Sequence, residues 1–112
     1  MGIAIKNVYM GQPGIADTTL YTTPANTVGR VLKCTVTNDT TTVVTISFNK
    51  RPAAVAAGPT NLIMNLKPIG SLETYECPEV VGQVLDATDL LSAIASVADQ
   101  LTVSLDIVEI VG

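Results

Sequence analysis

The sequence predicts an all-β protein: a single-domain antiparallel β-sandwich of jelly-roll-like form, with about eight or nine strands. Apolar and polar residues alternate with a period of two, β-branched residues dominate the alternating segments, and turn-forming residues separate them. The chain has 112 residues, and no internal repeat or linker divides it. We therefore expect one domain over 1–112, with an N-terminal arm or strand over 1–17 and the sandwich over 18–111.

The clearest strand covers residues 43–49, where Val44, Ile46 and Phe48 face one side and the residues between them are polar. Residues 32–37 and 101–107 show the same alternation, which is typical of half-buried strands. Short intervals between such segments favour a sandwich or jelly roll. We expect strands over 3–10, 18–23, 28–37, 42–50, 61–66, 72–77, 80–85, 91–97 and 101–111.

Turn-forming residues indicate how some of these strands connect. Asn38 and Asp39 stand between the strands expected over 28–37 and 42–50, which predicts a hairpin. Small residues and prolines over 52–60 predict a longer loop.

Two segments allow alternative interpretations. The apolar spacing over 89–98, with a capping residue at Thr88 or Asp89, favours a helix on periodicity alone. In the last strand, Val108 and Ile110 are apolar on the face opposite to the preceding apolar residues. Either a bulge near 106–108 or burial of the strand on both faces, for instance against a neighbouring subunit, explains this pattern.

Composition favours a protein that binds other proteins. Hydrophobic residues make up 47% of the chain and charged residues only 14%, so Thr, Ser and Asn fill many polar positions. Such a neutral surface costs little to desolvate in a protein interface. The net charge is −4 and only Lys50 and Arg51 are adjacent cations, which we interpret as a solvated strand end. We therefore expect no nucleic-acid partner.

The sequence also predicts no membrane partner. It contains no apolar run of the length that a membrane span requires. The N-terminus has no basic region followed by an apolar segment, so no signal peptide is visible. We expect the chain to be made and kept in the cytoplasm, or to be released by a route other than secretion.

No residues form a recognisable catalytic or metal-binding pattern. The chain has no histidine, which removes Ser-His, Cys-His and His-metal arrangements. Glu73 and Glu76 fall on opposite faces of their expected strand, so with Glu79 they indicate a solvated acidic edge. Asp86 and Asp89 have the spacing of a turn. We expect no enzyme, no catalytic residue, no metal site and no cofactor.

The two cysteines, Cys34 and Cys77, match no metal-binding or redox spacing. Cys34 lies on the apolar side of a strand pattern, which predicts a buried free thiol. A disulfide between the two requires that the fold bring them together, and a cytoplasmic origin argues against it.

The order of short motifs resembles a recurring small β-domain in virion structural proteins of tailed bacteriophages. The motifs are Leu-Tyr-Thr-Thr-Pro-Ala-Asn-Thr at 20–27, Gly-Ser-Leu-Glu-Thr-Tyr at 70–75, Val-Gly-Gln-Val-Leu-Asp-Ala-Thr-Asp at 81–89, and the segment 101–110. The resemblance covers about residues 18–110. Two positions depart from it, because Asn26 and Thr88 stand where glycine is expected.

The resemblance implies a function and favours a strand over 89–98. A free-standing chain of this size resembles a capsid decoration (cement) protein, which binds the outside of the head and joins neighbouring subunits. The implied partners are the major capsid protein and further copies of the chain, as a dimer or trimer. The implied location is the capsid exterior of the virion, after synthesis in the bacterial cytoplasm. The alternatives are a tail, neck or fibre-base protein, or a host-surface binding (adhesin-like) module.

Two segments are expected to contact partners. Residues 3–10 lie outside the resemblance, and residues 108–111 form the tail of the last strand. We expect both to pair with neighbours by strand addition. The candidate contact residues are Ile3, Ile5, Val8, Tyr9, Val108 and Ile110.

Overall fold

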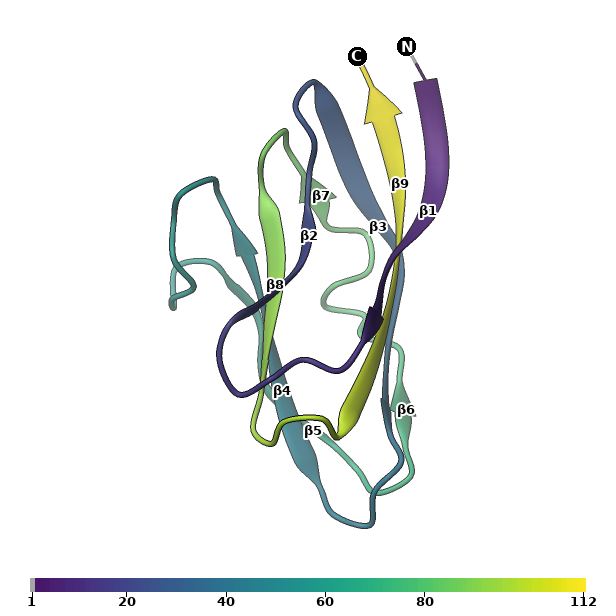
Figure 1. The fold of residues 1–112 in the computed structure, drawn as a ribbon, viewed down its shortest axis with the longest axis vertical. Helices are drawn as coiled ribbons and strands as arrows, with labels where there is room; N and C mark the ends of the chain where they lie inside the picture. Colours follow the sequence, from purple (N-terminus) through teal and green to yellow (C-terminus); the bar gives the residue numbers. More distant parts are fainter. Residues whose placement is uncertain (1) are drawn as a thin grey trace.

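The polypeptide forms two facing antiparallel sheets (Figure 1) in a computed structural model that describes residues 2–112. Within this range there are nine strands and no helix. The strands are β1 (Gly2–Gly11), β2 (Thr18–Thr22), β3 (Thr27–Asn38), β4 (Val44–Arg51), β5 (Leu62–Ile69), β6 (Thr74–Tyr75), β7 (Val84–Leu85), β8 (Leu90–Ala95) and β9 (Leu101–Val111). The predicted β-sandwich is confirmed.

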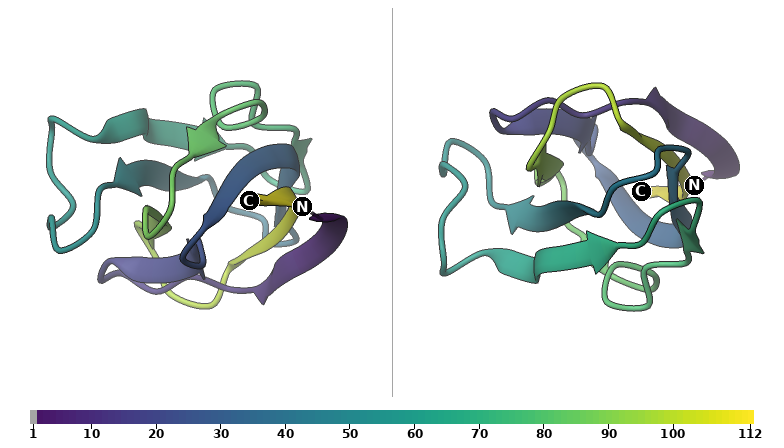
Figure 2. Two further views of the ribbon diagram at one scale, coloured as in Figure 1. Left: turned by 90° about the horizontal axis from the view of Figure 1, so that it is seen from above. Right: turned by 90° about the horizontal axis from the view of Figure 1, so that it is seen from below.

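The strand order is that of a jelly roll. Sheet A has the order β1-β9-β3-β6, with β7 also paired to β3, and sheet B has the order β2-β8-β4-β5. Most connections pass from one sheet to the other, and only β4–β5 and β6–β7 stay within a sheet. If β6 and β7 are taken as one interrupted strand, each sheet has four strands in jelly-roll order. Figure 2 shows the two layers along the strands, with the ends of β1 and β9 side by side.

The predicted hairpin at Asn38 and Asp39 is wrong, because β3 lies in sheet A and β4 in sheet B. Asn38 is a fully buried side chain that holds the crossing between the sheets. Its Nδ2 donates to the carbonyls of Thr42 (2.8 Å) and Ile69 (3.0 Å), and its Oδ1 accepts from the Thr40 amide (3.0 Å). Thr40 and Thr42 lie outside the strands, so these bonds satisfy their backbone groups and tie them to the last residue of β5.

The segment 89–98 contains β8, so the strand favoured by the resemblance is confirmed and the helix is not formed. β8 lies between β2 and β4, and its Leu91, Ala93 and Ala95 are buried. Pairing on both edges supplies the backbone hydrogen bonds that a helix would otherwise make internally.

The strands expected over 72–77 and 80–85 are reduced to the two-residue strands β6 and β7. Between them the chain turns, and the amides of Val80 and Val81 both donate to the Cys77 carbonyl (3.0 and 3.1 Å). The side chains of Cys77 and Val80 are fully buried. The apolar residues that suggested strands here therefore enter the core from a loop.

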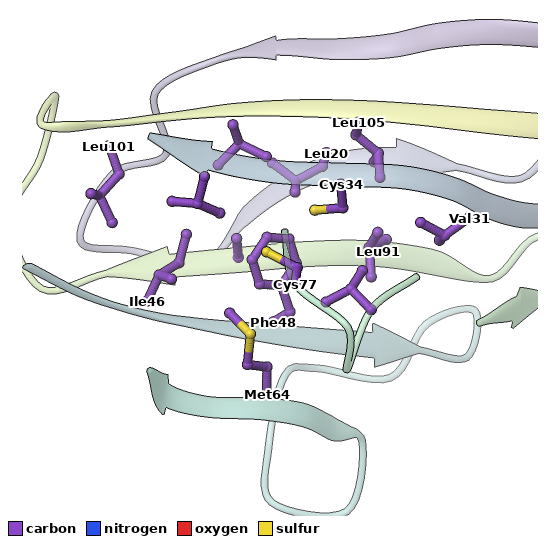
Figure 3. Packing of buried hydrophobic residues seen from close by; sticks show 14 of the residues in the cluster. Leu20, Val31, Cys34, Ile46, Phe48, Met64, Cys77, Leu91, Leu101 and Leu105 are labelled. Carbon is purple, nitrogen blue, oxygen red and sulfur yellow. The ribbon is translucent and has the colours of Figure 1, made fainter. Parts of the chain in front are cut away.

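The core fills the space between the sheets (Figure 3). Its largest fully buried side chain, Phe48, comes from β4. Cys34 and Cys77 are both buried free thiols in the same cluster, as predicted for Cys34. The neighbouring Cys77 thiol, together with burial, raises the pKa of Cys34, so the Cys34 thiol stays protonated at neutral pH.

Replacing Asn38 by alanine tests the role of this residue at the corner. Asn38→Ala leaves the buried Ile69 carbonyl and its neighbours without partners, so we expect the free energy of unfolding to fall by about 2–3 kcal/mol. Urea denaturation measures the change. Asn65→Ala, at an exposed position of β5, is the matched control. Equal effects of the two substitutions would contradict the assignment.

Candidate protein-binding face

Strand β9 is the central element of sheet A. It pairs with β1 along one edge and with β3 along the other. The register shifts lie in its neighbours, between Asn7 and Tyr9 in β1 and between Val31 and Lys33 in β3. The bulge expected near 106–108 is therefore not in β9, because the partner strands carry the extra residues. The alternation of β9 continues to its end, with Glu109 facing inward and Ile110 outward.

The inner face at this end of sheet A is polar. Glu109 is only 5% exposed, and its carboxylate accepts hydrogen bonds from the Lys6 ammonium (2.8 Å) and the Tyr21 hydroxyl (2.5 Å). The bond from Lys6, followed by the bond from Tyr21, lowers the pKa of Glu109. Burial, followed by the bond to Glu109, raises the pKa of Tyr21. A buried carboxylate is thus kept ionised by two partners from β1 and β2.

Glycine at position 29 makes room for this arrangement. A Cβ atom at Gly29 would lie 3.4 Å from the ring and hydroxyl of Tyr21 and 3.4 Å from Ile107. The Tyr21 ring therefore packs directly on the backbone of β3. In this position the Tyr21 hydroxyl reaches Glu109 on β9.

The outer face at the same end is apolar. One row across β1, β9 and β3 contains Ile3, Ile110 and Val28, and Ile3 is 69% exposed. The next row contains Ile5 (70% exposed), Val108, Arg30 and Val84. We call this surface the apolar face, and its apolar members are Ile3, Ile5, Val28, Val84, Val108 and Ile110.

The apolar face unites four of the six predicted contact residues, namely Ile3, Ile5, Val108 and Ile110. It does not include Val8, which stands at the β1 register shift, or Tyr9, which lies opposite the inward-facing Leu105. Both pack against the core.

Sequence reasoning missed Val28 and Val84, which adjoin the apolar face from β3 and β7. In the sequence Val28 has the same parity as Cys34, which the alternation places on the apolar side, and its outward position follows from the register shift between Val31 and Lys33. The sequence contained no signal for this shift, or for the position of Val84 beside β3.

A shallow hollow of about 770 Å³ lies beside β3 on sheet A. Its floor and rim are Leu32, Lys33, Thr74, Tyr75, Glu76, Pro78 and Val81. The Tyr75 hydroxyl donates to Glu79 (2.7 Å), which raises the pKa of Tyr75 to about 12 and lowers that of Glu79. The Lys67 ammonium lies 4.5 Å from the centre of the Tyr75 ring. This mixed lining suits an apolar side chain of a partner protein better than a charged ligand.

Two of the acidic side chains that the sequence singled out, Glu73 and Asp89, stabilise turns. Glu73 Oε1 accepts from the Gly70 amide (2.6 Å), and Asp89 Oδ2 accepts from the Asp86 amide (3.1 Å). The turn interpretation of Asp86 and Asp89 is confirmed. Among residues 2–112, no group of three or more Cys, Asp or Glu side chains is placed to hold a metal ion.

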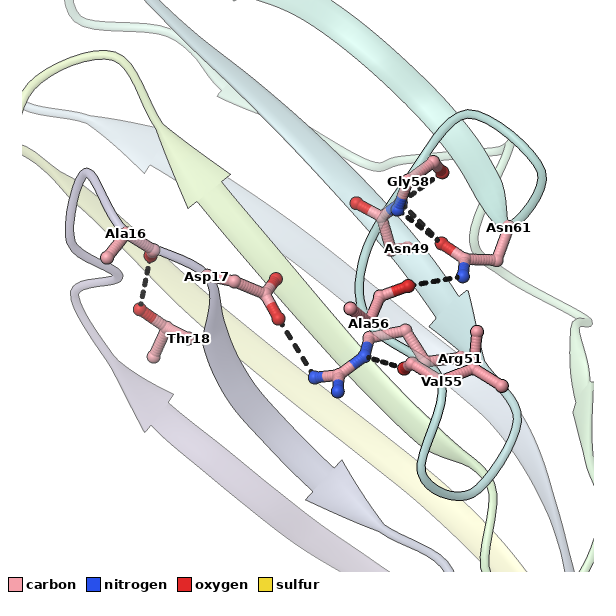
Figure 4. Close-up of polar contacts among 9 residues, drawn as sticks. All are labelled: Ala16, Asp17, Thr18, Asn49, Arg51, Val55, Ala56, Gly58 and Asn61. Carbon is pink, nitrogen blue, oxygen red and sulfur yellow. Dashed lines mark hydrogen bonds and ion pairs between the residues drawn. The ribbon is translucent and has the colours of Figure 1, made fainter.

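The adjacent cations lie at the end of β4, as expected, but their side chains are only partly exposed and have partners within the chain. Arg51 forms an ion pair with Asp17 (2.9 Å) and donates to the Val55 carbonyl (2.7 Å) in the loop shown in Figure 4. Lys50 donates to the Gln83 side chain (3.0 Å). These bonds join the end of β4 to the loops before β2, after β4 and before β7.

Comparisons with known proteins identify no relative: no family model matches the chain, and no curated protein or solved structure matches it. In residues 2–112, no helix has the length and apolar character needed to cross a membrane. The apolar face is therefore the feature from which a function is best inferred.

The ionised Glu109 gives the fold a predictable dependence on pH. Because the pKa of Glu109 lies below its ordinary value of 4.5 in the folded state, the ionised carboxylate stabilises the fold above that pH. This contribution is lost as the pH falls through the folded-state pKa. We expect Glu109→Gln to lower the free energy of unfolding at pH 7 by about 1–2 kcal/mol and to reduce its decline in acid.

Urea denaturation between pH 7 and pH 3 measures this effect. Asp39→Asn, at an exposed position, is the control that removes one carboxylate without removing a buried bond. A parallel decline for wild type and Glu109→Gln would show that Glu109 does not contribute.

Proposed function

We propose that this chain is a structural protein of a tailed-bacteriophage virion, a capsid decoration (cement) protein that binds the outside of the major capsid lattice through the apolar face. The proposal rests on one observation: at the end of sheet A a charged side chain is buried and apolar side chains are exposed, which is the reverse of the usual arrangement. Here the buried side holds the Glu109 carboxylate, while the solvent side holds Ile3, Ile5 and Ile110. Such an arrangement is costly for an isolated monomer and favourable once a protein covers the outer side.

The chemistry of the apolar face suits a protein partner. The face lies on four strands whose backbones are held by hydrogen bonds to one another. Binding a partner therefore costs little backbone conformational entropy. It has an apolar centre, and Arg30 lies in the same row as Ile5 and Val108, with its guanidinium beside Gly82 as a hydrogen-bond donor. An apolar centre with a few polar groups, arginine above all, is typical of stable protein interfaces.

The choice of a capsid partner rests on the resemblance of residues 18–110 to phage virion domains. Backbone geometry supports that resemblance. Asn26 and Thr88 stand where the resembling domains have glycine, and both have left-handed backbones, with φ of 58° and 70°. Glycine adopts this conformation without steric cost, so the turns at these positions have the geometry that the glycine motifs require.

The mechanism of such a protein is physical. A chain that binds the assembled lattice, and not the dissociated subunits, stabilises the assembled state by mass action. Each copy buries additional apolar surface where subunits meet, and the many copies on a shell add their contributions.

Binding to undecorated heads of the parent phage tests the proposal. We expect saturable binding of many copies per head and a higher temperature of head rupture. Val28→Lys and Ile110→Lys each place a charge on the apolar face, at side chains that are 40% and 38% exposed. Each should weaken binding by about tenfold or more, since a poorly solvated charge in the interface costs over 1.4 kcal/mol.

Val97→Lys is the matched control, because Val97 is 42% exposed and lies in the loop before β9, at the opposite end of that strand from the apolar face. Binding to isolated tails, or to host cells, without binding to heads would support the tail or adhesin alternative. Unchanged head binding by Val28→Lys and Ile110→Lys would exclude the apolar face as the contact.

A further inference from the structure

The strands at the edges of the two sheets differ in how well they are protected against pairing with another chain. β6 and β7 have only two residues each, and β2 has five with a register shift between Thr19 and Tyr21. β5 contains Pro68 and pairs irregularly with β4. Short strands, prolines and irregular pairing are devices by which proteins prevent edge-to-edge association.

The outer edge of β1 lacks these devices. Residues 2–7 pair with β9 in continuous register from Gly2 opposite Val111 to Asn7 opposite Asp106, so their free edge is also regular. This stretch has no proline, and its register shift comes only after Asn7. Its one charged residue, Lys6, is bound to the inward-facing Glu109. The backbone N–H and C=O groups on this edge are therefore able to form hydrogen bonds with a further strand.

We infer that β1 pairs antiparallel with β1 of a second copy of this chain, around a two-fold axis that passes between the two Ala4 residues. In this register Ile3 lies opposite Ile5 of the second copy on the outer side. On the inner side Ala4 lies opposite Ala4, and Lys6 lies opposite Gly2, so like charges do not face each other. Directly opposed β-branched residues stabilise antiparallel pairs.

Other registers fit less well. A two-fold axis at Ile5 would place Ile3 opposite Asn7, and would bring Val8, at the register shift, into the paired region. A two-fold axis at Ile3 would pair only residues 2–4 of the described stretch, whereas the Ala4 register pairs residues 2–6 and opposes Ile3 to Ile5. A contact that is self-complementary about a two-fold axis closes as a dimer and does not extend into a fibre.

The dimer joins two copies of sheet A and makes their apolar faces continuous, because Ile3 and Ile5 of both copies lie on the same outer side. This inference does not depend on what the apolar face binds. It adds that a partner meets one surface with two-fold symmetry, and that both copies can engage a partner lattice together.

Disulfide trapping tests both the dimer and its register. In the proposed register, opposed Cβ atoms at position 4 lie about 5 Å apart. We expect Ala4→Cys to form a covalent dimer with oxidised glutathione, in at least tenfold higher yield than Gly2→Cys. Gly2 is the matched control, because it lies on the same face of the same strand and a Cβ there meets no atom within 4 Å. The wild type measures any background from Cys34 and Cys77, which are buried.

Sedimentation equilibrium of the unmodified chain gives a second measure, with a dimer expected at about 100 µM. Ala4→Lys should raise the dimer dissociation constant at least tenfold without destabilising the monomer to urea, since Ala4 is exposed and its register partner Glu109 is an anion. Val28→Lys should leave the dimer intact, which separates this inference from binding at the apolar face. A monomeric wild type, or equal trapping of Ala4→Cys and Gly2→Cys, would overturn the inference.

Discussion

The unbroken pairing of β9 with β1 and β3 is the constraint on which the rest of sheet A depends. Its Leu101, Val103, Leu105 and Ile107 are all fully buried, so a slip of one residue would turn this whole set toward solvent. The strand therefore keeps its alternation to the end, and both neighbours accommodate their extra residues as register shifts. This alternation places Glu109 on the inner side and Ile110 on the outer side, although Glu109 is charged and Ile110 is apolar.

The buried Glu109 in turn determines how β1 is held. Its carboxylate binds Lys6 from β1 and Tyr21 from β2, so one buried charge connects both sheets to the N-terminal strand. A carboxylate without these partners would be strongly destabilising at this depth. In the structure β1 is thus an integral strand of sheet A, and what it offers to other chains is its outer edge and the apolar side chains beside it.

Local pattern in the sequence was sufficient for most of the fold, and tertiary context explains the failures. The strand over 101–111 was predicted with its observed bounds, because long alternation has one structural solution. Asn38 resembled an exposed turn residue, yet its side chain is buried at a crossing that only the sheet order defines. Ile3 and Ile110 were recognised as contact candidates from their own strands. Val84 was not, because its proximity depends on the pairing of β7 with β3.

The two register shifts next to β9 have a consequence for how the sequence can diverge. Core residues such as Val103 and Leu105 lie on one side of the two register shifts. The outward residues Ile3, Val28 and Ile110 lie on the other side, in contact with solvent. The buried Ile107 and Glu109 also lie beyond the shifts, so it is only at the outward positions that substitutions have little effect on folding. The outer side of this stretch of sheet A therefore tolerates changes of side chain that the buried sandwich does not.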